Sequence, residues 1–379
     1  MIGNGLTAGS LNATSAITVN GTLAFNRSDN ITQGTHFSTA AISGTGSIVQ
    51  NGAGSLTLNA ANTYSGGTTL NTGTIVIGNA NAAGNGTITQ ANGASLLKFD
   101  TTGTITNAMS VYNVLASQSA TLSGTITVNN ATWDIETGDT LTISGVVSGN
   151  GGVTKIGNGT LILSGSNSYN GTTVINAGTL NAANANALGS NNTVQVNGGT
   201  LLVSAADAIN GKNIVMGGSG VGLQFSGNYS GAIGTLTLSA NSIIDLGPDS
   251  VRIMIQGLTL SSHTLSFYNW SGLTLWNGGT GAADQDKVFL FPTIAPEDLN
   301  KISFYSGNGG DSFLGTGFDL GLEPTGFTPA WGHQIIPVPE PETWATGLLL
   351  LFGGAVWLWR KRSSLTTQRN LEGDAPSAP

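Results

Sequence analysis

The stretch that decides the fold is Gly54-Ser55-Leu56-Thr57-Leu58-Asn59-Ala60-Ala61-Asn62-Thr63-Tyr64-Ser65-Gly66. A second copy, with every position shifted by the same offset, reads Gly159-Thr160-Leu161-Ile162-Leu163-Ser164-Gly165-Ser166-Asn167-Ser168-Tyr169-Asn170-Gly171. Both copies continue into Thr-Thr and then into Gly-Thr-Ile or Gly-Thr-Leu, at residues 73–75 and 178–180. Self-similarity at a fixed offset is typical of repeat architectures, so the sequence predicts a chain of stacked units.

Each copy alternates between apolar and polar side chains. Leu56 and Leu58 point to one side of the chain, and Ser55 and Thr57 point to the other. The second copy repeats this pattern. A period of two over a short run, bounded by Gly or Asn, predicts a short half-buried strand.

More segments of this kind begin at Thr87, Thr104, Thr125 and Thr140. Their intervals, roughly 15–21 residues, match the coils of a β-solenoid, in which each coil buries its apolar side only by stacking on its neighbours. A β-sandwich, with strands about every 8–12 residues, is the alternative. Very short strands, frequent Gly and few aromatic residues favour a right-handed parallel β-helix over residues 1–240, with repeats at 42–76 and 147–181.

The composition agrees with an all-β chain. Charged residues make up 8% of the 379 residues, against about 25% in an ordinary soluble domain. The 57 glycines, with many Thr, Val and Ile, suit short strands joined by tight turns. The net charge is −8 and no basic stripe is present, which argues against nucleic-acid binding. Because Cys is absent, thiol enzymes, disulfide scaffolds and Cys-based metal sites are excluded.

The two ends of the chain differ from the predicted solenoid in amino-acid composition and sequence pattern. Aromatic and acidic residues become frequent after residue 240, so we expect residues 241–335 to form a β-rich cap over the last coil. Residues 336–343 read as a Pro-rich linker. At the other end, Met1-Ile2-Gly3-Asn4-Gly5-Leu6 lacks the basic and apolar regions of a secretory signal peptide. It reads like the middle of a repeat, so we expect a chain truncated at its N-terminus.

The C-terminal segment combines three features: a proline box, a short apolar run and a basic cluster. These are Val338, Pro339, Glu340 and Pro341; the run from Trp344 to Trp359; and Arg360, Lys361 and Arg362. The run would cover about 24 Å as a helix, which is short for a bilayer core of about 30 Å. The positive-inside rule places the basic cluster in the cytoplasm, and the prolines keep the preceding segment extended. We therefore expect a transmembrane helix at 344–359 and a cytoplasmic tail at 360–379, with a plain C-terminal anchor as the alternative.

Two parts of the chain resemble known families. The repeated Gly-x-Leu-x-Leu, Asn-x-Tyr-x-Gly and Gly-Thr-Ile/Leu elements resemble the autotransporter-associated β-strand repeat. That resemblance implies a parallel β-helix in a bacterial surface passenger region. The tail resembles the PEP-CTERM sorting signal: Pro339–Pro341 match its motif, and the apolar run and basic cluster match its other two parts. This resemblance implies recognition and cleavage by an exosortase in the inner membrane, although Ser363–Pro379 extend the chain past the basic cluster here.

Candidate catalytic and metal-binding residues are few. The densest acidic cluster in the predicted solenoid is Asp134, Glu136 and Asp139, and two carboxylates at alternate positions of a strand would face one side. Such a pair could perform acid–base chemistry or bind Ca²⁺, with Lys155 as the nearest basic partner. We interpret the cluster as a solvated strand face. The three histidines are far apart and read as surface or turn residues: His36, His263 and His333.

Three further patterns have ordinary explanations. Asp284 and Asp286 resemble the start of a Ca²⁺ loop but lack its Gly and closing Glu, so they read as a polar turn. Gly211-Lys212-Asn213 lacks the spacing of a phosphate-binding loop. The Thr-x-Thr steps, if stacked, would form an outward array suited to ordering water on ice, although Thr is also a common outward strand residue. We expect no metal and no cofactor.

Together these features predict a non-catalytic exported surface or extracellular-matrix protein, active in adhesion or in exopolysaccharide and biofilm association through weak multivalent contacts. A β-helix polysaccharide lyase or hydrolase is the alternative, and an ice-binding protein a more distant one. The expected partners are an exosortase-type protease, the bacterial inner membrane, and exopolysaccharide or other surface proteins. We expect the chain to lie outside the cytoplasm during transit through the inner membrane, and then at the cell surface or outside the cell.

Overall fold

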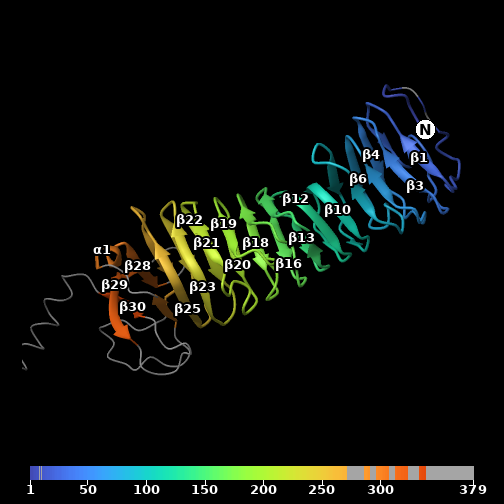
Figure 1. Cartoon of the computed structure of the whole chain (residues 1–379). Coiled ribbons are helices and arrows are strands. Elements are labelled where there is room, and N and C mark those ends of the chain that lie inside the picture. The colour runs from blue at the N-terminus through green and yellow to red at the C-terminus, as the bar shows by residue number, and fades with distance from the viewer. Residues whose placement is uncertain are drawn as a thin grey trace, which may run out of the picture.

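The computed structural model describes residues 1–7, 9, 11–270, 286–290, 296–306, 312–322 and 333–338. These residues form an elongated rod, a parallel β-solenoid of about 12 coils (Figure 1). The prediction of an all-β solenoid is therefore confirmed. Among the described residues, the helical segment is one short helix, α1 (Pro296–Leu299).

Each coil has three sides, and parallel pairing stacks the strands of one side along the rod. On the first side lie β1 (Thr22–Phe25), β3 (Ser47–Gln50), β5 (Thr68–Leu70), β7 (Ile88–Gln90), β14 (Val147–Ser148) and β27 (Lys287–Leu290). On the second side lie β2 (Ile31–Thr32), β4 (Ser55–Leu58), β6 (Thr74–Ile77), β8 (Leu96–Phe99), β15 (Val153–Ile156), β17 (Thr173–Ile175), β19 (Thr193–Val196) and β21 (Asn213–Met216).

On the third side lie β9 (Thr104–Ile105), β11 (Ala120–Leu122), β13 (Thr140–Ile143), β16 (Thr160–Leu163), β18 (Thr179–Ala182), β20 (Thr200–Val203), β22 (Gly220–Phe225), β24 (Ser242–Asp245), β26 (Leu265–Tyr268) and β28 (Ile302–Ser306). Four longer strands run across the first and second sides: β10 (Met109–Ala116), β12 (Ile126–Ile135), β23 (Tyr229–Leu238) and β25 (Val251–Thr259). The strands are short because turns rich in Gly and Asn interrupt each coil at its corners.

The core runs the length of the rod as rows of inward side chains. The predicted alternation is present, since Leu56 and Leu58 are fully buried while Ser55 and Thr57 are half-buried. Parallel pairing stacks the inward side chains of successive coils in rows. One row of the second side is apolar except for Lys155 and consists of Ile31, Leu56, Ile75, Leu97, Val114, Trp133, Lys155, Ile175, Val196 and Met216. Each coil thereby buries apolar surface that it could not bury alone.

The two sequence repeats occupy different sides of the rod. The first repeat places its strands on sides one and two and leaves the third side to loops, whereas the second uses sides two and three. The change occurs between them, where β9 to β14 supply strands to all three sides. There, β10 pairs with β12 at Met109 and Ile126, so the coil between these two residues has no room for a long loop. In the coils that follow, each strand of the repeat therefore lies one side further along the coil than its equivalent in the first repeat.

Parallel stacking continues past residue 240, because β24, β26 and β28 extend the third side in register. Antiparallel strands end the rod: β29 (Ser312–Leu322) pairs with β28 and β30, and β30 (His333–Val338) also pairs with β27. Aromatic rings fill the last described coils. Phe304 stacks on Phe267 at 5.2 Å between ring centroids and meets Trp270 edge-on at 4.7 Å.

Candidate functional site

The most specific part of the repeat, Asn-x-Tyr, is buried and joins successive coils. Asn62 accepts a hydrogen bond from the N–H of Ile42 at 2.8 Å and donates one to the carbonyl of Ala82 at 2.7 Å. These partners lie in the coils on either side of it. Asn167 makes the same two bonds in the second repeat, at 2.8 and 2.7 Å. Each amide side chain thus fixes the loops of three coils, and this part of the motif is structural.

The tyrosine of each repeat is buried as well. The hydroxyls of Tyr64 and Tyr169 each share a hydrogen bond with the threonine that begins the next strand, at 2.5 and 2.7 Å. Burial raises the pKa of both phenols. Gly84 and Gly189 pack against these residues with φ of +68° and +65°, and a Cβ there would lie within 2.4 and 2.5 Å of the tyrosine carbonyl oxygen. Only glycine fits this close approach in a left-handed backbone.

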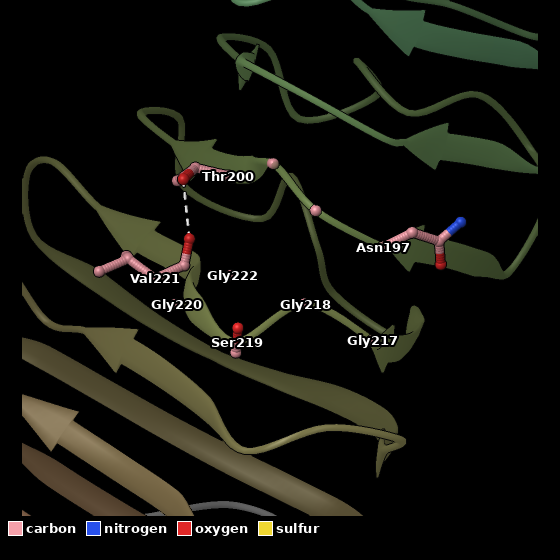
Figure 2. Close-up of a pocket in the computed structure, with 10 residues that line it drawn as sticks. Asn197, Thr200, Gly217, Gly218, Ser219, Gly220, Val221 and Gly222 are labelled. Atoms are coloured by element: carbon pink, nitrogen blue, oxygen red, sulfur yellow. Dashed lines mark hydrogen bonds between the residues drawn. The ribbon is translucent and has the colours of Figure 1, made fainter.

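A cleft of about 480 Å³ opens between two successive coils at the corner where the second side turns into the third (Figure 2). Residues 197–200 line one wall, residues 217–222 line the other, and most of these residues are glycines. The pairing of β20 with β22 begins at Leu201 and Leu223, after the residues that line the cleft. The Thr200 hydroxyl donates to the Val221 carbonyl at 2.7 Å across the gap (Figure 2). Because glycine lacks a side chain, the cleft wall is largely backbone.

Next to this cleft, outward threonines form a row along the third side. Pairing places Thr140, Thr160, Thr179 and Thr200 in succession, one in each coil. We call these four residues the threonine row. Within the described part of the chain, the hydroxyls of the first three make no hydrogen bond to protein, whereas that of Thr200 binds Val221. The row therefore presents unused hydroxyls to solvent.

A second outward row lies at the next outward position of the same strands. We define it as Thr142, Ile162, Asn181, Leu202, Gln224, Asp245 and Tyr268. Asp245 is 6% exposed, and its carboxylate accepts hydrogen bonds from Gln224 at 3.0 Å, Asn269 at 2.5 Å and the N–H of Gly247 at 2.9 Å. Beyond it, the rings of Tyr268 and Tyr305 lie 5.1 Å apart. The row thus changes from polar and aliphatic side chains to aromatic ones.

Among the described residues, the carboxylates of the acidic cluster form no ion pair with a basic side chain. β12 ends at Ile135, so Asp134 lies on the strand and Glu136 directly follows it; alternation with the buried Trp133 and Ile135 leaves both carboxylates on the outward side, as expected. Lys155 points into the core and is 0% exposed. Its ammonium donates to the carbonyls of Ile156, Gly157 and Ala177 at 2.6, 2.7 and 3.3 Å. Among the described residues, no group of three or more His, Asp or Glu is arranged to hold a metal ion.

The other candidate residues are dispersed or structural. His36 accepts a hydrogen bond from the N–H of Thr32 at 3.0 Å, His263 lies in a turn, and His333 begins β30. Asp286 is buried and accepts a hydrogen bond from the N–H of Val251 at 2.8 Å, while Asp284 lies outside the described residues. Lys212, from the Gly-Lys-Asn step that lacks the spacing of a phosphate-binding loop, is buried and donates to the carbonyls of Gly189 and Asn191 at 2.8 and 2.6 Å.

The Thr-x-Thr steps do not form one array. The steps at Thr87 and Thr125 belong to the first side, and those at Thr104 and Thr140 belong to the third. These four steps therefore do not supply the single stacked array that the distant ice-binding alternative requires. The threonine row was missed because Thr160 and Thr179 are not followed by a second outward threonine but by Ile162 and Asn181.

The predicted sorting signal falls almost entirely outside the described residues. Val338 is the last residue of β30, and Pro339, Glu340, Pro341, the run from Trp344 to Trp359 and Arg360, Lys361 and Arg362 all follow it. In the part of the chain that the structure describes, no helix is long and apolar enough to cross a membrane.

Comparison with known families agrees with the geometry of the repeats. Residues 48–77 and 153–182 match the family model of the passenger-associated-transport-repeat. These segments cover the four-strand units β3–β6 and β15–β18, including both buried Asn-x-Tyr motifs. A search of curated proteins and one of solved structures found no match. The chain therefore carries two autotransporter-associated repeats within a β-solenoid, an arrangement that fits a cell-surface or exported protein.

Proposed function

We propose that this chain is a non-catalytic surface or extracellular-matrix protein that acts in adhesion or in association with exopolysaccharide. One observation carries this proposal: the specific residues of the repeats are buried and structural, while the outside of the rod is nearly uncharged. A rigid rod of this kind presents many similar polar groups in register. Contacts that are weak one at a time become strong when many are made together.

The proposal includes processing at the C-terminus. Pro339, Glu340 and Pro341 would form the recognition segment of a PEP-CTERM-type signal, 344–359 a transmembrane helix, and Arg360, Lys361 and Arg362 the cytoplasmic stop. An exosortase-type protease of the inner membrane would cleave near the proline box and release the solenoid. The support is the order and spacing of these three features in the sequence.

Surface exposure is tested by protease treatment of intact cells that express the full chain with an epitope tag in the exposed turn at Gly138. Loss of the tag from intact cells, with a cytoplasmic marker protein preserved, is the expected result. Tag that is digested only after lysis would contradict export.

Processing is tested by mass spectrometry of the surface or released protein. We expect a mature form that lacks Arg360 and every residue after it, and we expect Glu340→Gln to accumulate unprocessed protein at the inner membrane. The matched control is Glu323→Gln, which removes a carboxylate from the same side of the apolar run but outside the proline box. Released protein with an intact C-terminus would sink the processing proposal.

The geometry does not favour the alternative of a polysaccharide lyase or hydrolase. Such an enzyme would need Asp134 or Glu136 beside an accessible basic group, and Lys155 is enclosed in the core. Depolymerisation of an acidic polysaccharide that disappears in the Asp134→Ala/Glu136→Ala double variant would overturn the non-catalytic proposal.

A further inference from the structure

We propose that the third side of the solenoid binds an extended, uncharged polysaccharide laid along the rod axis, from the threonine row to the aromatic rings near β28. This inference deepens the proposed function and rests on it for the setting in which the ligand is met. Binding itself is a property of the folded chain and can be measured separately from export.

The first support is the periodic geometry of the threonine row. Stacked parallel strands repeat about every 4.8 Å along the rod. Thr140, Thr160 and Thr179 therefore place one hydroxyl per coil at a constant interval, and within the described residues none of these hydroxyls has a protein partner. One sugar ring of an extended glycan is about as long as one such step. A repeating ligand can thus meet an equivalent group in each coil.

The second support is the charge of this side. The third-side strands from β9 to β22 contain no Asp, Glu, Lys or Arg. The charged member of the second row, Asp245, is 6% exposed and already accepts three hydrogen bonds. An acidic polysaccharide or a phosphate would lose its hydration without gaining a cation. A neutral ligand exchanges water for hydroxyl and amide groups without that penalty.

The third support is the aromatic end of the same side. Tyr268 and Tyr305 are half-buried with their rings 5.1 Å apart, and Phe313, 41% exposed, lies 5.4 Å from Tyr305. Rings of this kind offer large apolar surfaces with little conformational entropy to lose. The apolar faces of sugar rings stack on them, while Gln224 stands one coil before Asp245 as a polar neighbour.

The cleft at residues 197–200 and 217–222 lies on the line between these two groups. Thr200 belongs both to the threonine row and to the cleft wall (Figure 2). Because the wall is mostly glycine, a sugar ring could approach the backbone closely there. Continuous parallel pairing joins the strands of this side from coil to coil, so binding costs little reorganisation.

The same side is less suited to ice. A flat ice-binding array needs hydroxyls in both rows, but the second row has one threonine, Thr142, and continues with Ile162, Asn181 and Leu202. Thermal hysteresis is therefore an outcome that the test must include.

The test measures retention of the purified full chain, kept in mild detergent, on microcrystalline cellulose as a neutral glycan and on immobilised alginate as an acidic one. The binding variant is Thr160→Asp/Thr179→Asp, which puts two charges in the threonine row. The matched control is Thr154→Asp/Thr193→Asp, which puts two charges on outward, half-buried threonines of the second side. A further variant, Phe313→Ser, removes the most exposed ring.

We expect retention on cellulose but not on alginate. The threonine-row variant should lose at least about tenfold in apparent affinity, Phe313→Ser should lose a smaller factor, and the second-side control should bind like the parent. Circular dichroism must show the same β-sheet spectrum for all four proteins; if the threonine-row pair unfolds, Thr160→Val/Thr179→Val replaces it. Equal loss in both double variants, preference for alginate, no retention on cellulose, or thermal hysteresis in place of glycan binding would overturn the proposal. The protease test of surface exposure on intact cells does not depend on the outcome of this binding test.

Discussion

Replacing Lys155 with glutamine should remove a pH dependence from the stability of the solenoid. The Lys155 side chain lies in the inward row between Trp133 and Ile175, where every other named member is apolar. Burial lowers the pKa of its ammonium to about 8, and the nearby carboxylate of Asp134 opposes this shift only in part. The folded chain therefore holds a cation in a place that favours the neutral amine.

The sign of the effect follows from proton binding. Between pH 8 and the ordinary lysine pKa of 10.5, the unfolded chain keeps the proton of Lys155 and the folded chain releases it. Stability therefore rises with pH across this window, and below pH 8 the cost of the buried charge is fully present. One pKa unit corresponds to about 1.4 kcal/mol, so the contribution grows by about 2 kcal/mol between pH 8 and pH 9.5.

Glutamine is the informative replacement because the first repeat already uses it. Gln50 occupies the equivalent position there, and its side-chain amide donates to the carbonyls of Gly52 and Gly54 at 2.9 and 2.8 Å. A glutamine in place of Lys155 would cap the equivalent turn carbonyls without a charge. We expect Lys155→Gln to be at least as stable as the parent at pH 7 and to lack the rise above pH 8.

The assay is native-state amide hydrogen exchange in β15 and β17 at pH 7, 8 and 9.5, because long repeat arrays do not unfold as a single unit. The quantity compared is the parent-minus-variant difference in opening free energy after correction for intrinsic exchange rates, so that contributions from other titrating groups cancel. A difference that stays flat or falls from pH 8 to pH 9.5 would refute the reasoning. A variant that loses about 3 kcal/mol at every pH would show that the ammonium's hydrogen bonds outweigh its burial cost.

Three further predictions concern the second repeat and the coils that follow it. Asn167→Ala leaves the buried N–H of Val147 and the carbonyl of Ala187 without their side-chain partner. The free energy of unfolding of this region, measured by urea titration, should therefore fall by about 2–4 kcal/mol. Gly189→Ala should destabilise by more than about 1 kcal/mol because its Cβ meets backbone 2.5 Å away, whereas Gly211→Ala, with a similar φ but nothing within 4 Å, should cost less; thermal melts of the two variants compare them. Because burial raises the pKa of Tyr169 above its ordinary value of 10, the unfolded chain alone ionises just above pH 10; stability should fall there, and less so in Tyr169→Phe, as followed by circular dichroism.

The fold could be read from the sequence because its strongest signals are local. Alternation at Ser55–Leu58 fixes which side chains are buried, and the constant offset between the two copies reveals the repeat. What the offset hides is the position of each repeat around the rod. That position depends on the short coil at Met109–Thr125, whose missing loop is visible only once the strands are paired.

The surroundings of individual side chains were less predictable, because they depend on residues in neighbouring coils. Lys155 reads as an exposed basic residue when taken alone, and only its neighbours Trp133 and Ile175, one coil away on either side, place it in the core. Comparison with Gln50 at the equivalent position could have revealed this role. The members of the threonine row are likewise one coil apart, so no short window of the sequence contains two of them next to each other.

Because the two repeats are shifted by one side, their equivalent loops lie on different sides of the rod. The loop that carries Asn62 and Tyr64 stands over the third side, and the loop that carries Asn167 and Tyr169 stands over the first. Two copies of one partner, each docked in the same way on one repeat, would project from the rod in different directions. The two would therefore face different sides of the rod and not one common surface.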